Sequence, residues 1–361
     1  MRSGLRTRIA VLLVLLAALT LMTLTARKLR GAESSRSYPL LSEKEAAMRY
    51  PYAHLDDRGR ALYSTLLGGI REHAEWITLP DTYTDKEYER IYLMVGMQEP
   101  ELFALDDTYE LAEEMNETHI RYAYDADETA RMAERMDAAA EAILKRISPA
   151  QNENQKLLML HDLLAERTEY LETDKSATAY GALAEGMAQC EGYAKAYLYL
   201  ARKAGLNVMN VSGTSDETPH VWNVAQIDGT YYNIDVTWDD SESFRGKTGH
   251  TYFAMPDKFW TDHKTDTTIY TPPKCVGTKE TYYAARGLIL NSVTQLDDKL
   301  RTWIGLYPLT EFQCTDSATM EQAVSEIRSN PYVMNTISDL TDGSWSYMCD
   351  RDRRVVVILT G

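Results

Sequence analysis

The chain has 361 residues with 38 Lys or Arg and 54 Asp or Glu, so its formal net charge is −16 at pH 7. Six of the basic residues and none of the acidic ones lie in the first 30 residues, which leaves 32 basic against 54 acidic residues, or −22, for the rest. So acidic a surface repels nucleic acid and anionic headgroups, which argues against a nucleic-acid-binding function, and the length allows two or three packed units.

The first 30 residues differ in composition from the rest of the chain. Three arginines precede an uncharged run over residues 9–26, and three more basic residues follow it directly. Eighteen such residues are close to the minimum that spans a bilayer, and no clear cleavage site follows them. We therefore predict an uncleaved signal anchor over residues 1–30, with the soluble part outside the cytoplasm. A cleaved signal peptide, and hence a secreted bacterial protein, is the alternative.

Residues 31–41 are polar and irregular and predict a linker. Residues 42–147 carry mainly helical periodicity, interrupted by a strand-like alternation in HIRYAYDA, residues 119–126. We expect this mainly helical region to pack against the following unit or to shape access to it. A purely structural role fits the pattern equally well.

The next unit, residues 148–263, begins with a helix that Ser148 and Pro149 start. His161 lies on its apolar face, and we interpret it as a packed helix residue. A second helix follows Cys190 and ends near Gly205. Cys190 therefore lies at a helix N-terminus, where unsatisfied N–H groups favour the thiolate and its own N–H is a candidate oxyanion donor.

Two strand-like segments, residues 221–227 and 230–236, flank Asp228-Gly229, the strongest short signal for a two-residue hairpin. That turn would pair Ile227 with Thr230, Trp222 with Asp235 and His220 with Thr237. His220 and Asp235 then become diagonal neighbours on one face of the hairpin, within reach of a side-chain hydrogen bond.

Each of these residues alone has an ordinary structural interpretation: an inert buried thiol, a hydrogen-bonded histidine, an aspartate that ends a strand. Together they predict a thiol site in which Cys190 is the nucleophile. His220 is then the general base and acid, and Asp235 is the carboxylate that orients the imidazole.

The segments AYGALAEGMAQCEGYAKAYLYLARKAGL, HVWN and GTYYNIDVTWDD resemble the transglutaminase-like superfamily of papain-type thiol enzymes, most closely its bacterial membrane-anchored or secreted members. The resemblance implies an α+β core, with the helix of Cys190 packed on an antiparallel sheet that bears His220 and Asp235. It also implies that Trp222, Tyr232 and Trp238 frame the site, with Trp222 and Trp238 as substrate-binding residues. The residue before the nucleophile, Gln189 in this chain, varies within the family, so the resemblance assigns it no oxyanion role. His263, at the end of a segment that resembles the one following the core, is interpreted as structural.

Residues 264–361 predict a small α+β domain. Residues 292–306 and 317–330 read as helices, and residues 309–314, 332–339, 344–350 and 353–361 read as strands. Of the three cysteines other than Cys190, Cys314 and Cys349 are a candidate disulfide pair. The spacing of His, Cys and acidic residues gives no metal signature, and we expect no obligatory metal or cofactor.

The expected chemistry is acyl transfer through a thioester on Cys190. Hydrolysis would make the protein a cysteine peptidase or amidase, which we favour, with a peptide or protein substrate that the expected location would associate with the cell wall. Transfer to a primary amine would make it a protein-glutamine cross-linking transglutaminase. A non-enzymatic scaffold that binds peptide or wall polymer, with an occluded triad, is the third hypothesis.

Overall fold

The computed structural model describes residues 37–112 and 116–360. Within these ranges no helix is both long and apolar enough to cross a membrane. Even the 21-residue helix α6 (Ala126–Arg146) is amphipathic, with four buried side chains and charged residues along the rest. The prediction of a transmembrane anchor, with its single-pass extracytoplasmic localisation, is corrected by this finding, and residues 1–30 themselves lie outside the described part.

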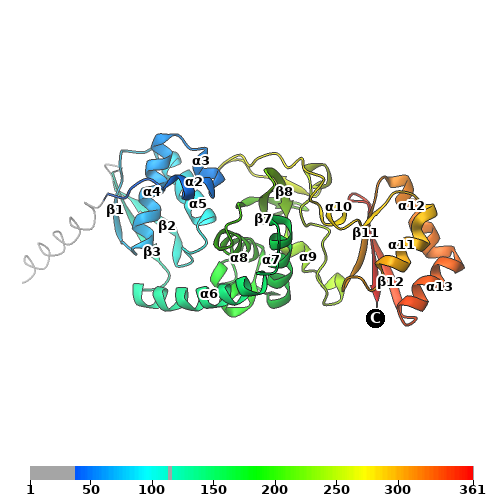
Figure 1. Cartoon of the computed structure of the whole chain (residues 1–361). Helices are drawn as coiled ribbons and strands as arrows, with labels where there is room; N and C mark the ends of the chain where they lie inside the picture. Colours follow the sequence, from blue (N-terminus) through cyan, green and yellow to red (C-terminus); the bar gives the residue numbers. More distant parts are fainter. Residues whose placement is uncertain (1–36, 113–115, 361) are drawn as a thin grey trace, which may run out of the picture.

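Three units follow one another along the molecule, coloured blue to cyan, green to yellow and orange to red in Figure 1. The first has helices packed on a three-stranded sheet of order β1-β3-β2 and its own apolar cluster. Its elements are α2 (Glu43–Ala47), α3 (Tyr50–Ala53), α4 (Asp57–Arg71), β1 (Trp76–Thr78), α5 (Asp85–Gln98), β2 (Leu105–Leu111) and β3 (Glu117–Tyr122). The expected strand within residues 119–126 is therefore part of β3, whereas β1 and β2 add strands that the helical periodicity did not indicate.

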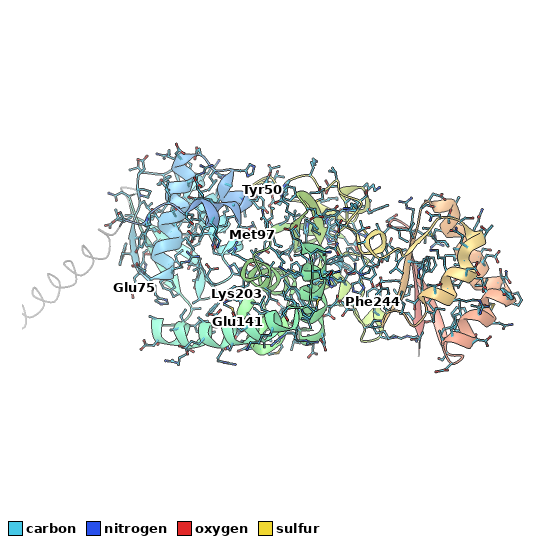
Figure 2. The ribbon with its side chains drawn as sticks, in the orientation of Figure 1. Tyr50, Glu75, Met97, Glu141, Lys203 and Phe244 are labelled. Carbon is cyan, nitrogen blue, oxygen red and sulfur yellow. The ribbon has the colours of Figure 1, made fainter. Side chains whose placement is uncertain are left out.

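The central unit packs α6, α7 (Glu153–Arg167) and α8 (Cys190–Lys203) with an antiparallel sheet of order β8-β7-β6-β9. The sheet strands are β6 (Val208–Ser215), β7 (Thr218–Ile227), β8 (Thr230–Ile234) and β9 (His263–Thr265), and the small elements are β4 (Glu169–Tyr170), the π-helix Gly181–Glu185, β5 (Met187–Ala188), α9 (Val236–Asp239) and the 3₁₀ turns Glu242–Phe244 and Asp257–Phe259. Glu141 of α6 and Lys203 of α8 are labelled in Figure 2. Lys203 Nζ lies 3.6 Å from Glu141 Oε1, and this ion pair links the two helices. The α+β class expected from the sequence is confirmed.

The third unit covers the four-stranded sheet β10-β11-β13-β12 with helices. Its elements are α10 (Tyr282–Ala285), β10 (Ile289–Leu290), the 3₁₀ turn Val293–Gln295, α11 (Leu296–Trp303), β11 (Thr310–Cys314), α12 (Ser317–Ser329), α13 (Pro331–Leu340), β12 (Trp345–Asp350) and β13 (Val355–Thr360). Buried apolar residues of this sheet belong to the same continuous cluster as those of the central unit. The sheet therefore packs against the central unit, and the domain boundary at residue 264 stays a prediction.

Two expectations for this third unit are wrong. Residues 332–339 form the helix α13 rather than a strand, because Asn330 caps the helix through the N–H of Tyr332 and Pro331 occupies its first turn. Cys314 and Cys349 are both free. Strand β13 lies between their strands, with Val356 paired to Cys349 on one side and to Phe312 on the other. Two strand spacings, about 9–10 Å, exceed the Cα separation that a disulfide accepts.

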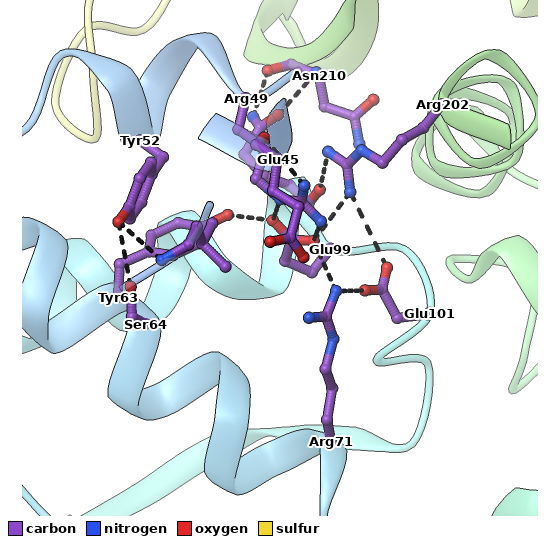
Figure 3. Close-up of polar contacts among 12 residues, drawn as sticks. Glu45, Arg49, Tyr52, Tyr63, Ser64, Arg71, Glu99, Glu101, Arg202 and Asn210 are labelled. Carbon is purple, nitrogen blue, oxygen red and sulfur yellow. Dashed lines mark hydrogen bonds and ion pairs between the residues drawn. The ribbon is translucent and has the colours of Figure 1, made fainter. Parts of the chain in front are cut away.

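A buried ionic cluster around Glu99 attaches the first unit to the central one (Figure 3). The Glu99 carboxylate, with a fully buried side chain, accepts from Arg49 Nε at 2.7 Å and from Arg202 Nη1 at 2.9 Å, and also from the hydroxyl of Tyr63. Arg202 belongs to α8, the helix that begins at Cys190. The cluster thus fixes α8 against the first unit.

Replacing Glu99 with alanine is expected to lower the free energy of unfolding by about 3–5 kcal/mol, because it leaves two arginines without their shared carboxylate. Denaturant unfolding measures the loss. Glu101→Ala is the matched control, since its ion pair with Arg71 is more exposed, and we expect that change to cost less than about 1 kcal/mol. Equal losses in the two variants would contradict the anchoring role of the cluster.

Candidate active site

Cys190 is the first residue of α8, as the sequence indicated, and its side chain is half-buried. The preceding chain reverses at Gly186, whose φ of +73° is a conformation that favours glycine. Gly192 lets the first turn of α8 press against the backbone of Ser176, because a Cβ there would lie 2.0 Å from the Ser176 carbonyl oxygen. Gly205, at φ +74°, follows the last turn of α8. These glycines place Cys190 at a tightly packed helix N-terminus.

The predicted hairpin is confirmed over most of its length. Ile227 pairs with Thr230, and the ladder continues to Asn223 and Ile234. Asp228 and Gly229 both have positive φ, as the two-residue turn requires. The ladder stops before Trp222 and Asp235, because the chain turns into α9 at that point. Asp235 caps this helix through Oδ1, which accepts from the N–H of Thr237 at 3.0 Å and of Trp238 at 3.2 Å.

His220 and Asp235 are in direct contact, with His220 Nε2 2.6 Å from Asp235 Oδ2. Both side chains are buried. A carboxylate accepts only, so Nε2 carries the proton and Nδ1 is the nitrogen left for the sulfur of Cys190. Cys190 is among the groups that raise the pKa of His220, so the thiol lies near this ring. The structure thus brings His220 and Asp235 into contact with Cys190 nearby, while the catalytic roles of the three residues stay a prediction.

The electrostatics of the site favour a charged imidazole. Burial opposes a charge on His220, but the carboxylate of Asp235 and the contact with Cys190 outweigh it and raise the His220 pKa to about 10. Burial likewise opposes a charge on Asp235, whose pKa nevertheless falls to about 2 because two histidines donate to it. An imidazolium beside a thiol favours the thiolate, the form that acts as a nucleophile.

The second histidine on Asp235 is His263, for which the sequence predicts a structural role. His263 Nε2 lies 3.1 Å from the same Oδ2 atom, and Nδ1 lies 2.7 Å from Asp262 Oδ1. Asp235 therefore receives four donors, two from backbone and two from imidazole rings. No sequence signal showed this contact, because β9 joins the sheet beside β6, a strand that the sequence interpretation did not include.

The three predicted framing aromatics have different surroundings. Trp238 is half-buried and meets the His220 ring edge-on, with centroids 6.4 Å apart. Trp222 is 1% exposed and packs behind the ring of His220, so it supports the histidine and offers no surface to a substrate. Tyr232 lies on the opposite face of β8, where its hydroxyl accepts from the N–H of Glu280. A substrate-binding role thus stays a prediction for Trp238, and Tyr232 does not frame the site.

A second buried group of acids and histidines joins the central unit to the third. His161 of α7 lies between Asp162 at 3.0 Å and Asp239 at 3.2 Å. His250 lies between Asp162 at 3.0 Å and Glu311 of β11 at 2.5 Å. Among the described residues, His161, Asp162 and His250 form one of two groups with donor atoms close enough to hold a metal ion, and His220, Asp235 and His263 form the other. Both ring nitrogens of His161 and of His250 face carboxylates. We therefore interpret the group around these two histidines as a series of ion pairs.

The ion pairs of His250 are expected to make the folded protein less stable at alkaline pH. Burial disfavours the charged form of His250, but Glu311 and Asp162 outweigh it and raise its pKa to about 10. A histidine whose pKa rises on folding stabilises the folded state fully below about pH 6.5, and this stabilisation disappears as the pH rises through about 10. From pH 6 to pH 10 we expect the free energy of unfolding, measured with denaturant, to fall by about 1–3 kcal/mol more in the wild type than in His250→Gln. Parallel pH curves for the two proteins would refute this assignment.

One comparison with protein families covers the part of the chain that contains Cys190, His220 and Asp235. Residues 141–236, about a quarter of the chain, match the family model described as the transglutaminase-like superfamily, which confirms the resemblance. No curated protein matches the chain.

Among solved structures, a Cytophaga hutchinsonii protein proposed to be a cysteine protease is 16% identical, with TM-score 0.28, over 39% of this chain and 46% of that one. A structure described as a TGase is 13% identical, with TM-score 0.28, over 45% of this chain and 50% of that one. A Parabacteroides distasonis protein proposed to be a protease is 10% identical, with TM-score 0.22, over 37% and 34%. The chain thus spans about half the length of the first two.

Proposed function

We propose that the region matched by the transglutaminase-like model, residues 141–236, is a cysteine peptidase or amidase. The observation that supports the proposal is the convergence of three groups. Cys190 lies at the start of α8 and is among the groups that raise the pKa of His220, and His220 Nε2 is 2.6 Å from Asp235 Oδ2. This is the arrangement in which an imidazole activates a thiol and a carboxylate holds the imidazole in the useful tautomer.

The proposed reaction has two steps. The Cys190 thiolate attacks an amide carbonyl, the C–N bond breaks, and the His220 imidazolium gives its proton to the leaving amine. The thioester that remains reacts with water, from which His220 takes a proton, and the acid product leaves as the thiolate re-forms. In this reaction the unsatisfied N–H groups at the start of α8, that of Cys190 included, stabilise the oxyanion.

A cavity of about 520 Å³ lies between the first and central units, with Leu93 and Phe103 on one side and Glu191 of α8 and Val221 of β7 on the other. Val221 and His220 are adjacent in β7, so their side chains point to opposite faces of the strand. Cys190, His220 and Asp235 are not among the residues that line this cavity.

The fate of the thioester separates hydrolysis from cross-linking. We expect a library of quenched fluorescent peptides to be cleaved by the wild type, and a glutamine-containing peptide to release ammonia at the same rate with or without a fluorescent primary amine. Incorporation of the amine faster than release of ammonia would instead assign a transglutaminase. Both outcomes require Cys190, which Cys190→Ala controls.

A further inference from the structure

A line of alternating charges leads from the catalytic carboxylate into the third unit. Asp235 Oδ2 accepts from His263 Nε2 at 3.1 Å, and His263 Nδ1 donates to Asp262 Oδ1 at 2.7 Å. The same Oδ1 accepts from Arg353 Nη2 at 2.5 Å. Arg353 lies in the turn between β12 and β13, about 90 residues beyond Asp262 in the sequence.

Arg353 is held in place on several sides. It is 2% exposed, its Nη1 donates to Asp350 at 2.9 Å, and its own N–H donates to the same carboxylate at 2.8 Å. Its guanidinium lies 4.1 Å from the centre of the Tyr252 ring, and the Tyr252 hydroxyl donates to Asp262 Oδ2 at 2.8 Å. The planar fork of an arginine thus fixes both oxygens of Asp262, one directly and one through Tyr252.

His263 passes this constraint on to the active site. Both ring nitrogens face carboxylates, so both carry protons and the ring is an imidazolium. Burial lowers the pKa of His263, but the carboxylates of Asp235 and Asp262 outweigh it and raise that pKa. The ring also stacks on Trp260 with centroids 4.3 Å apart, so its orientation follows from where Asp262 holds it. The position of Asp235 Oδ2, which also binds His220, depends in turn on this ring.

We propose that Arg353 is a positioning residue for the thiol chemistry, acting through Asp262 and His263 on Asp235. The inference rests on the proposed function, and it makes the C-terminal sheet a working part of the active site. Without this support Asp235 would hold His220 less accurately. A modest displacement of this kind slows a reaction that requires a preorganised site by about tenfold.

The test is the rate at which iodoacetamide alkylates Cys190 at pH 6, read by mass spectrometry of the peptide that contains it. The thiolate displaces iodide, so the rate reports the thiolate-imidazolium pair without requiring a substrate. We expect Arg353→Met to react about tenfold more slowly than the wild type and Arg353→Lys, which keeps the charge, to recover to within about threefold. Arg351→Met is the matched control, since Arg351 lies in the same turn and pairs with exposed Glu321; its rate should equal that of the wild type.

A double-mutant cycle with His263→Gln separates positioning from general destabilisation. If Arg353 acts through His263, the double variant reacts at the rate of His263→Gln alone. Multiplied losses, or a wild-type rate in Arg353→Met, would overturn the proposal. If Arg353→Met does not fold, judged by thermal unfolding, Arg353→Lys takes its place in the cycle, with about a threefold loss in the wild-type background and none in His263→Gln.

The same experiment distinguishes failure of this inference from failure of the proposed function. Wild-type Cys190 that reacts no faster at pH 6 than the half-buried Cys349 of the same chain would remove the proposed function. Fast wild-type alkylation that Arg353→Met leaves unchanged would remove only the role of Arg353.

Discussion

Replacing Cys190 with alanine is expected to reduce cleavage of the quenched peptide library by about 10⁴-fold or more, since no covalent intermediate forms without the thiol. Cys190 occupies the first position of α8 and is among the groups that raise the pKa of His220. Initial rates at saturating and at low peptide concentration measure kcat and kcat/KM.

The matched control is Cys349→Ala, which removes a half-buried thiol from the third unit. We expect that variant to retain the wild-type rate. Residual activity in Cys190→Ala within about tenfold of the wild type would contradict covalent catalysis by this residue.

Replacing Asp235 with asparagine is expected to lower kcat by about 10³–10⁴-fold. Asp235 accepts from two imidazole rings and two backbone N–H groups, whereas the amide of asparagine offers one acceptor oxygen and a donor group. An amide N–H directed at His220 Nε2 would force the proton onto Nδ1, the nitrogen that must accept from the thiol. The variant therefore holds His220 in the wrong tautomer.

The kcat of Asp235→Asn measured from pH 5 to 9 tests this argument. Asp216→Asn is the control, because Asp216 is exposed at φ +48°, a conformation that asparagine tolerates. A kcat for Asp235→Asn within about threefold of the Asp216→Asn value would show that Asp235 does not orient His220.

The local parts of the site could be predicted because short sequence signals determine them. Asp228-Gly229 sets the hairpin register, which brings His220 and Asp235 to one face. The helical periodicity after Cys190, ended by Gly205, places the thiol at the start of α8. Each signal acts over fewer than about twenty residues and does not depend on distant packing.

The remaining contacts depend on pairings between distant segments. His263 reaches Asp235 because β9 pairs with β6, and Arg353 reaches Asp262 because the C-terminal sheet packs into the central core. Periodicity carries no information on such neighbours. At residues 332–339 the decisive signal is local: the Asn330-Pro331 helix start determines the structure, and the alternation of apolar residues that favours a strand does not.

The supposed disulfide failed for a topological reason. The spacing of cysteines does not predict the order of strands in a sheet. Here β13 lies between β11 and β12 and separates Cys314 from Cys349. Similarly, the family resemblance placed Tyr232 around the site, while the alternation of side chains along β8 places it on the opposite face.

The pH dependence of alkylation at Cys190 tests the central claim most directly. In the wild type we expect Cys190 to react rapidly with iodoacetamide from pH 5 upward and much faster than Cys349 of the same chain at pH 5–6. In His220→Ala, Cys190 should follow the same profile as Cys349. Coincident profiles for the two cysteines in the wild type would contradict an activated thiol and support a non-catalytic scaffold instead.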